Sequence, residues 1–239
     1  MNSYKSKVAF ITGGSKGIGY GVAEALLKLD MRVAITSRSQ ESANAAAEKL
    51  SKLGKGEIIG LEADVRDFES QQQAVKRTLD KWGQIDVLIA NAGIGHFAPI
   101  ENLSIEQWQE TIDTNLSGVF YSVKSTLESL KKSQGYIITI SSLAGTNFFA
   151  GGTAYNASKF GVTGFTQAAM LDVRDHGIKV STIMPGSVAT HFNDHTPNEK
   201  DAWKIQAEDI GELVVDLLKM NPRTLPSKVE VRPSQPPKK

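Results

Sequence analysis

The sequence predicts an α/β fold in which helices cover both faces of one parallel sheet. Short runs rich in β-branched residues alternate with amphipathic helical stretches along the chain, as in successive βαβ units. Two of these runs, Val8-Ala9-Phe10-Ile11 and Val87-Leu88-Ile89-Ala90, are apolar at every position, which is typical of strands buried on both faces. No linker or internal repeat divides the chain, so we expect one doubly wound α/β domain over residues 1–239.

Seven strands and six helices are expected in alternation. The strands are predicted at 8–12, 32–37, 57–62, 86–91, 135–141, 179–184 and 228–232. The helices are predicted at 18–29, 40–53, 68–82, 104–132, 153–176 and 208–219, and Asp67 is a candidate N-cap of the third. We expect residues 185–207 to form a substrate loop and the proline-rich residues 233–239 to form a loose tail.

The composition is that of an ordinary globular protein. Its 27 basic and 26 acidic residues leave a formal net charge of +1, which gives no electrostatic basis for binding nucleic acid or an anionic membrane. The chain has no cysteine, which excludes disulfides and fits a reducing compartment. The sequence contains no signal pattern and no apolar run of spanning length, so we expect a cytoplasmic protein with a small-molecule partner. The four histidines lack metal-ligand spacing, and no catalytic metal is expected.

A glycine-rich turn follows the first predicted strand and opens into a helix. It reads Thr12-Gly13-Gly14-Ser15-Lys16-Gly17-Ile18-Gly19. The glycines let the backbone turn tightly and let phosphate groups approach without interference from a Cβ atom. The free amides and the dipole at the helix N-terminus favour an anion. The turn is therefore predicted to hold the pyrophosphate of a dinucleotide.

The glycine spacing, Gly13-x3-Gly17-x-Gly19, resembles the Thr-Gly-x3-Gly-x-Gly motif of the short-chain dehydrogenase/reductase family. Further motifs that resemble those of the family follow later predicted strands: Asp64-Val65, Asn91-Ala92-Gly93, and Pro185-Gly186 with Val188 and Thr190. All of them lie just beyond the carboxyl ends of strands, where open α/β sheets bind ligands. The resemblance covers essentially the whole chain. It implies a Rossmann-type domain with a seven-stranded parallel sheet in the order 3-2-1-4-5-6-7.

The same resemblance assigns roles to these motifs. It implies that Asp64 hydrogen-bonds the adenine ring, and that Asn91-Ala92-Gly93 lies along the cofactor and steadies the sheet. It also implies that Val188 and Thr190 hold the nicotinamide carboxamide. The cofactor would then be a nicotinamide dinucleotide.

Tyr155 and Lys159 lie four residues apart in a predicted helix, so they share one face. An ammonium beside a phenol lowers the pKa of the phenol towards working pH, which suits a general acid/base. Ser142 precedes the tyrosine at the spacing of the family's Ser…Tyr-x3-Lys motif, and the resemblance implies that it binds the substrate oxygen. Its neighbour Ser141 is the competing candidate and should face the other way. Asn115 matches the family's fourth catalytic residue, which binds a water that links Lys159 to solvent.

The second predicted strand ends in Thr36-Ser37-Arg38, with no carboxylate in reach of a ribose 2′-hydroxyl. Arg38 offers a bidentate partner for a 2′-phosphate, and Lys16 offers a second positive charge. The expected cofactor is therefore NADP(H). The predicted cofactor-binding residues are Gly13, Ser15, Lys16, Gly17, Ile18, Gly19, Arg38, Asp64, Val65, Asn91, Ala92, Gly93, Tyr155, Lys159, Pro185, Gly186, Val188 and Thr190.

The predicted reaction is the reversible reduction of a ketone or aldehyde to an alcohol, with Tyr155 as general acid/base. Apolar and aromatic residues from three loops are candidates to line the substrate pocket: Ile94, His96, Phe97, Phe148, Phe149, Phe192 and Trp203. Such a lining favours uncharged hydrophobic or aryl carbonyls, as in a carbonyl reductase of fairly broad scope. The alternative is a 3-oxoacyl thioester (acyl-carrier-protein) reductase. The chain departs from those relatives at its end, where Lys228-Val229-Glu230-Val231-Arg232-Pro233 replaces a glycine-rich final strand.

Two other classes stay open. A catalytically idle dinucleotide sensor would keep the glycine turn but could lose the Tyr155/Lys159 pair, which this chain retains. A sugar-nucleotide epimerase or dehydratase shares Tyr-x3-Lys but would need a substantial C-terminal substrate domain, which does not follow the sixth strand. The predicted helices at 104–132 and 153–176 carry apolar and small residues on more than one face, which predicts a homotetramer or homodimer.

Overall fold

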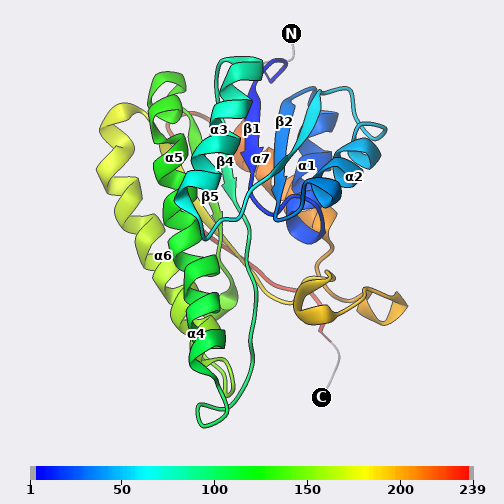
Figure 1. The fold of residues 1–239 in the computed structure, drawn as a ribbon, viewed down its shortest axis with the longest axis vertical. Helices are drawn as coiled ribbons and strands as arrows, with labels where there is room; N and C mark the ends of the chain where they lie inside the picture. Colours follow the sequence, from blue (N-terminus) through cyan, green and yellow to red (C-terminus); the bar gives the residue numbers. More distant parts are fainter. Residues whose placement is uncertain (1–3, 237–239) are drawn as a thin grey trace.

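A seven-stranded parallel sheet forms the centre of the computed structural model, which describes residues 4–236 (Figure 1). Its strands are β1 (Val8–Ile11), β2 (Arg32–Ser37), β3 (Ile58–Glu62), β4 (Val87–Ala90), β5 (Tyr136–Ile140), β6 (Lys179–Pro185) and β7 (Lys228–Val231). They lie in the order β3-β2-β1-β4-β5-β6-β7, and every neighbouring pair is parallel. The predicted fold class and strand order are confirmed.

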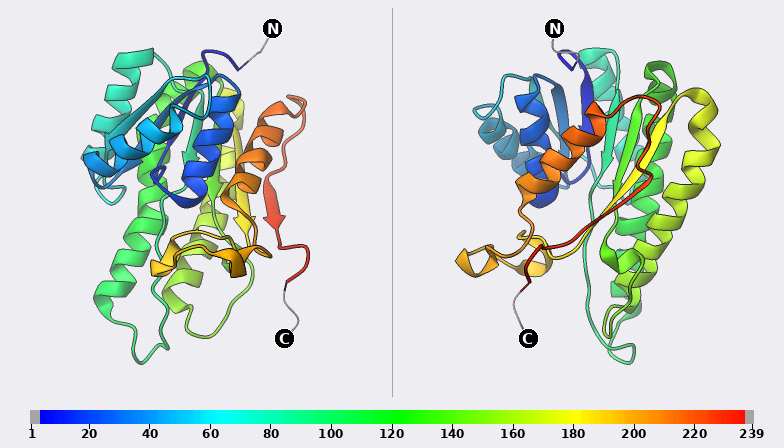
Figure 2. Two further views of the ribbon diagram at one scale, coloured as in Figure 1. Left: turned by 90° about the vertical axis from the view of Figure 1, so that its right-hand side faces the viewer. Right: turned by 180° about the vertical axis from the view of Figure 1, so that it is seen from behind.

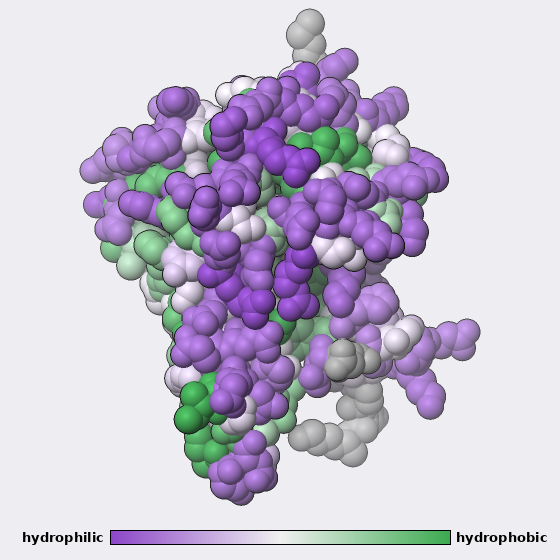
Figure 3. All heavy atoms as spheres, viewed as in Figure 1, coloured by the Kyte–Doolittle hydropathy of each residue, from purple (hydrophilic) through white to green (hydrophobic). Residues whose placement is uncertain are grey.

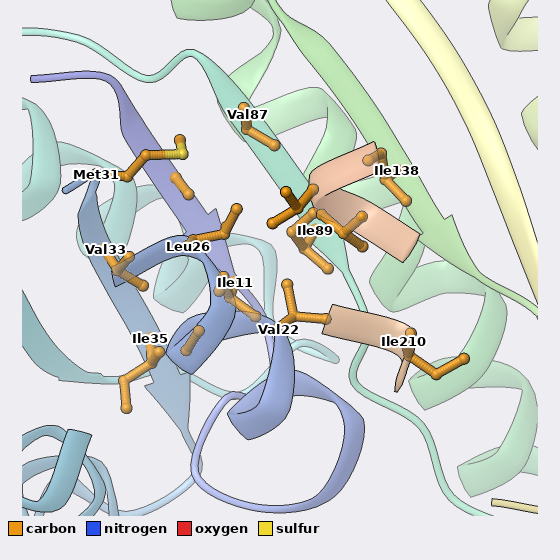
Figure 4. Packing of buried hydrophobic residues seen from close by; sticks show 14 of the residues in the cluster. Ile11, Val22, Leu26, Met31, Val33, Ile35, Val87, Ile89, Ile138 and Ile210 are labelled. Carbon is orange, nitrogen blue, oxygen red and sulfur yellow. The ribbon is translucent and has the colours of Figure 1, made fainter. Parts of the chain in front are cut away.

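Helices cover both faces of the sheet, as Figure 2 shows from two further sides. One layer contains α1 (Gly17–Lys28), α2 (Gln40–Leu50) and α7 (Ala207–Lys219); the other contains α3 (Phe68–Trp82), α4 (Ile105–Ile112), α5 (Gly118–Ser133) and α6 (Thr153–Val173). Side chains alternate across each strand, so Ile11 and Ile89 pack into the core beside α1 (Figure 4), whereas Phe10 and Leu88 pack into the core on the other face. Both faces of the sheet are buried by apolar residues of the helices, which explains why the strands read as unbroken apolar runs.

The helix boundaries follow local capping chemistry. The Asp67 side chain accepts from the backbone N–H of Glu69 and caps α3, as predicted, and Ser104 caps α4 in a capping box with Gln107. The predicted helix at 104–132 contains a π-helical turn, Asp113–Ser117, between α4 and α5. A π turn holds one residue more than an α turn, and such turns are frequent at functional sites. Sequence periodicity did not indicate it.

The carboxyl ends of the strands point towards the lower end of the molecule in Figure 1, where the loops that follow them gather. The segment predicted as a substrate loop lies at this end and is folded. Its two stems pair through the Ala189 N–H to the Ile205 carbonyl, 2.8 Å, and the Ile205 N–H to the Ser187 carbonyl, 3.1 Å. Two short 3-10 helices, Phe192–Asp194 and Glu199–Asp201, lie between the stems. We call residues 187–205 the lid.

Residues 233–236 of the predicted tail contain no helix or strand, and 237–239 lie outside the described residues. Among the helices of the described chain, none combines the length and the apolar character needed to cross a bilayer.

Candidate active site

The glycine turn between β1 and α1 is packed too closely for side chains. A Cβ atom on Gly13, where φ is 66°, would lie 2.9 Å from the Cα of Ala92, and one on Gly19 would lie 2.5 Å from the Gly13 carbonyl oxygen. Helix α1 begins after Lys16, and no side chain caps its first amides. Uncapped amides at a helix N-terminus are donors for an anion. The turn therefore fits a pyrophosphate.

Asn91, at the end of β4, fastens this turn to the sheet. Its Nδ2 donates to the carbonyls of Thr12 and Gly13 at 2.9 and 3.0 Å. The Thr12 hydroxyl oxygen in turn accepts from the backbone N–H groups of Asn91 and Ala92 at 3.1 and 3.2 Å. These four bonds hold the ends of β1 and β4 at a fixed separation. The crevice outside these two strand ends is where open α/β sheets bind their ligands.

Two cations stand at the mouth of this crevice. Lys16 and Arg38 are exposed, and in the described part of the chain neither forms an ion pair within 4.0 Å. The Ser15 hydroxyl, 3.4 Å from that of Ser37, brings the glycine turn to the end of β2 beside Arg38. A phosphate placed between them would meet two positive charges that no carboxylate of the described residues pairs with at ion-pair distance, although Asp64 is near enough to Arg38 to interact with it electrostatically.

Asp64 and Val65, which follow β3, lie beside the same crevice. Both carboxylate oxygens of Asp64 accept from the Arg66 guanidinium, at 2.6 to 3.1 Å. These hydrogen bonds hold the pKa of Asp64 below its usual value, so the carboxylate is ionised at neutral pH. An adenine amino group would share this carboxylate with Arg66. Val65 is buried, and its side chain packs against Gly118 of α5.

Lys159 is buried on the inner face of α6, behind Tyr155. Its Nζ donates to the Ile140 carbonyl at 2.9 Å and lies 5.7 Å from the centre of the Tyr155 ring. Burial penalises the charged ammonium and lowers the pKa of Lys159 to about 8. A lysine with such a pKa can gain and lose a proton near neutral pH.

The pKa of Tyr155 is shifted upwards. Burial raises it, and a hydrogen bond with Ser142 opposes that shift. This direction differs from the sequence expectation that Lys159 lowers the pKa. The reason is that Lys159 Nζ is directed to the Ile140 carbonyl, so desolvation of the phenol outweighs the effect of the ammonium.

Ser141 and Ser142 face opposite ways at the end of β5. Ser141 is buried, and its hydroxyl donates to the Lys159 carbonyl and lies 3.0 Å from the Thr163 hydroxyl. The Ser142 hydroxyl is beside Tyr155 and donates to the Pro185 carbonyl at 3.4 Å. Only Ser142 therefore shares the space next to the tyrosine.

Asn115 lies in the π turn and is fully buried. Its Oδ1 accepts from the Ile94 N–H at 2.8 Å, and its Nδ2 donates to the Ile94 carbonyl at 2.9 Å and to the Ser158 hydroxyl at 3.0 Å. The Ser158 hydroxyl donates to the Tyr155 carbonyl at 2.8 Å. The amide of Asn115 thus joins the loop after β4 to α6, the helix that carries Tyr155.

The last predicted cofactor motif lies at the start of the lid. Pro185 ends β6, and the N–H of Gly186 donates to the Val231 carbonyl at 2.8 Å. Val188 forms a parallel bridge with Ile205. Thr190 lies beside the glycine turn, because a Cβ on Gly17 would be 3.3 Å from the Thr190 Cβ. The lid therefore extends from the end of β6 to the glycine turn.

Two phenylalanine rings pack on Tyr155, and a third packs on one of these two. The ring centre of Phe97 lies 5.3 Å from that of Tyr155, and the Phe192 ring lies 5.6 Å from it. Phe97 also contacts Phe149 at 5.8 Å and Phe192 at 6.2 Å. Tilted and edge-on rings at these separations are favourable aromatic pairs. We call Phe97, Phe149 and Phe192 the aromatic cage.

Other predicted pocket residues lie outside this cage. Phe148 is 86% exposed, and within the described residues it has no ring partner. Trp203 packs in the lid under Lys204, whose Nζ is 5.9 Å from its ring. His96 is turned to Glu110, with its Nε2 2.9 Å from Oε2 of the carboxylate. Sequence alone could not separate Phe148 from Phe149, because loop side-chain directions leave no periodic signal.

Asn156 is a site residue that the sequence analysis missed. Its Nδ2 donates to the carbonyls of Ala144 and Asn147, both at 2.8 Å, and its Oδ1 accepts from the Phe149 N–H at 3.4 Å. These bonds fix the loop between Ser142 and the cage against α6. An asparagine in the first turns of a helix, next to a predicted catalytic residue, was the available signal, because asparagine favours backbone contacts over helix interiors.

The comparisons with known proteins agree with this geometry. The family model described as short chain dehydrogenase matches residues 7–201. The chain belongs to the short-chain dehydrogenase family. A 3-oxoacyl-[acyl-carrier-protein] reductase of Synechocystis sp. is 36% identical over 197 residues, which are 82% of this chain and 79% of the relative. A trans-4-hydroxycyclohexanecarboxylate dehydrogenase of Sinomonas cyclohexanicum is 34% identical over 77% of this chain and 73% of its own.

Solved structures extend the similarity of this short-chain dehydrogenase to its full length. An alcohol dehydrogenase from Thermococcus sibiricus, complexed with 5-hydroxy-NADP, is 30% identical and covers 98% of this chain and 99% of its own, with a TM-score of 0.91. A metagenomic short-chain oxidoreductase in complex with NADP is 31% identical over 98% of this chain and 100% of its own, with a TM-score of 0.85. Membership of the family makes the chain an oxidoreductase that acts on CH–OH or C=O groups and binds a nicotinamide cofactor.

Proposed function

We propose that this short-chain dehydrogenase reduces a ketone or aldehyde to an alcohol, reversibly, with NADPH as cofactor and Tyr155 as general acid/base. The observation that carries the proposal is the convergence of Tyr155, Ser142 and buried Lys159 under an aromatic cage at the carboxyl end of β5. A proton donor, an oxygen ligand and a cation within one small volume are what carbonyl reduction requires. The Phe97 and Phe192 rings cover one side of the Tyr155 ring.

The bound nicotinamide would supply the hydride. Ser142 holds the carbonyl oxygen and polarises it, and Tyr155 gives its phenolic proton to that oxygen as the alcohol forms. Lys159, with a pKa of about 8, then stabilises the phenolate and passes a proton towards it. The amide of Asn115 is already engaged with Ile94 and Ser158, so a water that links Lys159 to solvent would bind the main chain of the π turn.

Two exposed cations that form no ion pair within 4.0 Å in the described residues support the preference for NADPH. Arg38 and Lys16 flank the end of β2, and a 2′-phosphate would form charge-assisted hydrogen bonds with both. NADP and 5-hydroxy-NADP occupy two similar structures. The glycine turn would hold the pyrophosphate, and Asp64 and Thr190 would contact the adenine and nicotinamide ends.

The aromatic cage favours uncharged hydrophobic or aryl carbonyls, as in a carbonyl reductase. The second candidate is reduction of a 3-oxoacyl thioester, which the names of the Synechocystis relative and of others at 34 to 36% identity favour. Comparing kcat/KM for a substituted acetophenone and an acetoacetyl thioester separates the two. A thioester preference of about a hundredfold, or roughly 2.7 kcal/mol of transition-state binding, would establish the second candidate.

Tyr155→Phe tests the chemistry itself. The variant keeps the ring and its contacts but removes the proton donor, so kcat should fall about 10³-fold while NADPH binding stays unchanged. Tyr121→Phe is the matched control, because that ring packs on Phe68 and Phe120 and forms no ring contact with the aromatic cage or Tyr155 in the described residues; it should leave kcat unchanged. If Tyr155→Phe retains more than about a tenth of the activity, Tyr155 is not the acid.

The apolar surface of the helices supports self-association. Trp108, Phe120, Phe160 and Leu171, on α4 to α6, are 37 to 55% exposed. Figure 3 shows hydrophobic residues gathered at the lower end of the molecule, where α4 begins. Large exposed apolar residues on neighbouring helices are typical of subunit interfaces. We propose a homodimer or homotetramer that buries this surface.

A further inference from the structure

Gly95 follows the Asn91-Ala92-Gly93 motif by two residues and lies directly against two rings of the aromatic cage. A Cβ atom on Gly95 would lie 2.6 Å from Cζ of Phe192 and 2.8 Å from Cζ of Phe97. Carbon atoms that are not bonded do not approach this closely. Gly95 is not among the residues with positive φ, so its backbone does not require glycine. The absence of a side chain at position 95 is what lets the Phe192 ring occupy its place.

Phe192 is the side chain through which the lid contacts the catalytic tyrosine. The side-chain contacts of Asp201 stay within the lid: its carboxylate pairs with His195 and Lys204, and it accepts from the Asn198 N–H. The lid is therefore tied together internally. The Phe192 N–H donates to the Thr190 hydroxyl at 3.3 Å, and its ring reaches across to Tyr155.

The Phe192 ring limits the access of a substrate to Tyr155. The Phe192 ring lies against both Tyr155 and Phe97, so it borders the space next to the phenol in which a carbonyl group must be held. A substrate bound there has to fit beneath Phe192 or lift it from Gly95. A flat ring can insert beside the cage rings in a tilted or offset arrangement, whereas a puckered ring with the same carbon skeleton is thicker.

We propose that Gly95 is a specificity-determining residue: it seats the Phe192 ring, which closes the lid over Tyr155 and makes the enzyme prefer carbonyls that carry a flat ring. This inference rests on the carbonyl reductase function proposed above. Phe192 is the cage ring that belongs to the lid, whereas Phe97 lies in the loop after β4 and Phe149 in the loop before α6. Residue 95 then controls selectivity although it has no side chain to touch a substrate.

The test compares acetophenone with cyclohexyl methyl ketone, which have the same carbon skeleton and differ in the flatness of the ring. In Gly95→Ala and in Phe192→Ala, the ratio of their kcat/KM values should fall at least tenfold from that of the wild type. Gly95→Ala keeps all three phenylalanines, so its effect reports the contact between residue 95 and the Phe192 ring and not the loss of a ring. Phe148→Ala is the matched control, because that neighbouring ring is exposed and outside the cage; its ratio should stay within twofold.

A second measurement does not depend on turnover. Hydrogen exchange of the stem amides of Ala189 and Ile205, followed in the full chain, should become at least tenfold faster in Gly95→Ala and Phe192→Ala and stay unchanged in Phe148→Ala. Unchanged exchange in both variants would show that the contact between Gly95 and the Phe192 ring does not hold the lid in place. Faster exchange with an unchanged substrate ratio would overturn the role in specificity. A wild type that binds NADPH but reduces neither ketone would refute the proposed function, while the exchange data would still decide whether Gly95 seats Phe192.

Discussion

Lys159 carries a cost of burial that a variant can measure. Its side chain is fully buried, and the pKa of the ammonium falls from the ordinary 10.5 to about 8. Between these two pH values the unfolded chain binds more protons than the folded one, so the free energy of unfolding rises with pH. The burial of Lys159 therefore destabilises the folded state by its full amount below pH 8, and this destabilisation is lost as pH rises towards 10.5. Lys159→Met, which keeps the length of the side chain without its charge, removes it at every pH.

The size of the effect follows from the pKa shift. At about 1.4 kcal/mol per pKa unit, the shift of Lys159 corresponds to a cost of about 3 kcal/mol at pH 7. The variant also loses the hydrogen bond from Nζ to the Ile140 carbonyl, which contributes about 1 kcal/mol. Lys159→Met should therefore be about 2 kcal/mol more stable than the wild type at pH 7. Near pH 9.5, where most of the cost is relieved in the wild type, the two should be about equally stable.

Urea denaturation of both proteins at pH 7 and pH 9.5, without added cofactor, measures the difference. The same variant should have no measurable reductase activity, because it lacks the cation beside Tyr155. Stability and chemistry would then move in opposite directions at one position. A variant that is less stable than the wild type at pH 7, or a difference that does not shrink by pH 9.5, would show that the lysine is not held at a cost.

Three further outcomes are expected. Arg38→Ala should reduce the ratio of kcat/KM for NADPH over NADH about tenfold to a hundredfold, since a charge-assisted contact with the 2′-phosphate is lost; an unchanged ratio in steady-state kinetics would remove Arg38 from the site. Asn156→Ala should raise KM for the ketone about tenfold and lower the free energy of unfolding by about 2 kcal/mol, because the Ala144 and Asn147 carbonyls lose their donor, while the Kd of NADPH stays constant. Light scattering at micromolar concentration should give a mass of two or four chains, and a single species of 25.9 kDa would contradict the oligomer.

The sheet could be predicted from the sequence because its signals are local. Unbroken apolar runs mark strands covered on both faces, and the glycine turn after β1 fixes where the chain enters the first helix. Strand order came from the family resemblance, since periodicity alone does not say which strands are neighbours. The observed helix ends differ from the predicted ones where a helix gives way to a turn. Helix α2 ends at Leu50, and α6 ends at Val173 before a 3-10 turn.

Much of the candidate site depends on contacts between distant segments, which a single sequence does not show. The π turn forms where Asn115 reaches both Ile94 and Ser158, and neither contact changes the hydrophobic period of the helix. The direction of the Tyr155 pKa depends on burial, which spacing on a helix cannot measure. Gly95 reads as one more loop glycine until the Phe192 ring is placed upon it.

Asn115 deserves particular care in any attempt to redesign the pocket. Its amide holds two segments at once: it bonds the Ile94 main chain, in the loop that leads on to Gly95 and Phe97, and it bonds Ser158 of α6. Removing the amide would free both the loop that carries Phe97 and the helix that carries Tyr155 from these hydrogen bonds. Loss of activity in an Asn115 variant would therefore not by itself identify a proton relay. A design that widens the pocket can therefore vary the phenylalanines of the aromatic cage, but it has to keep Asn115.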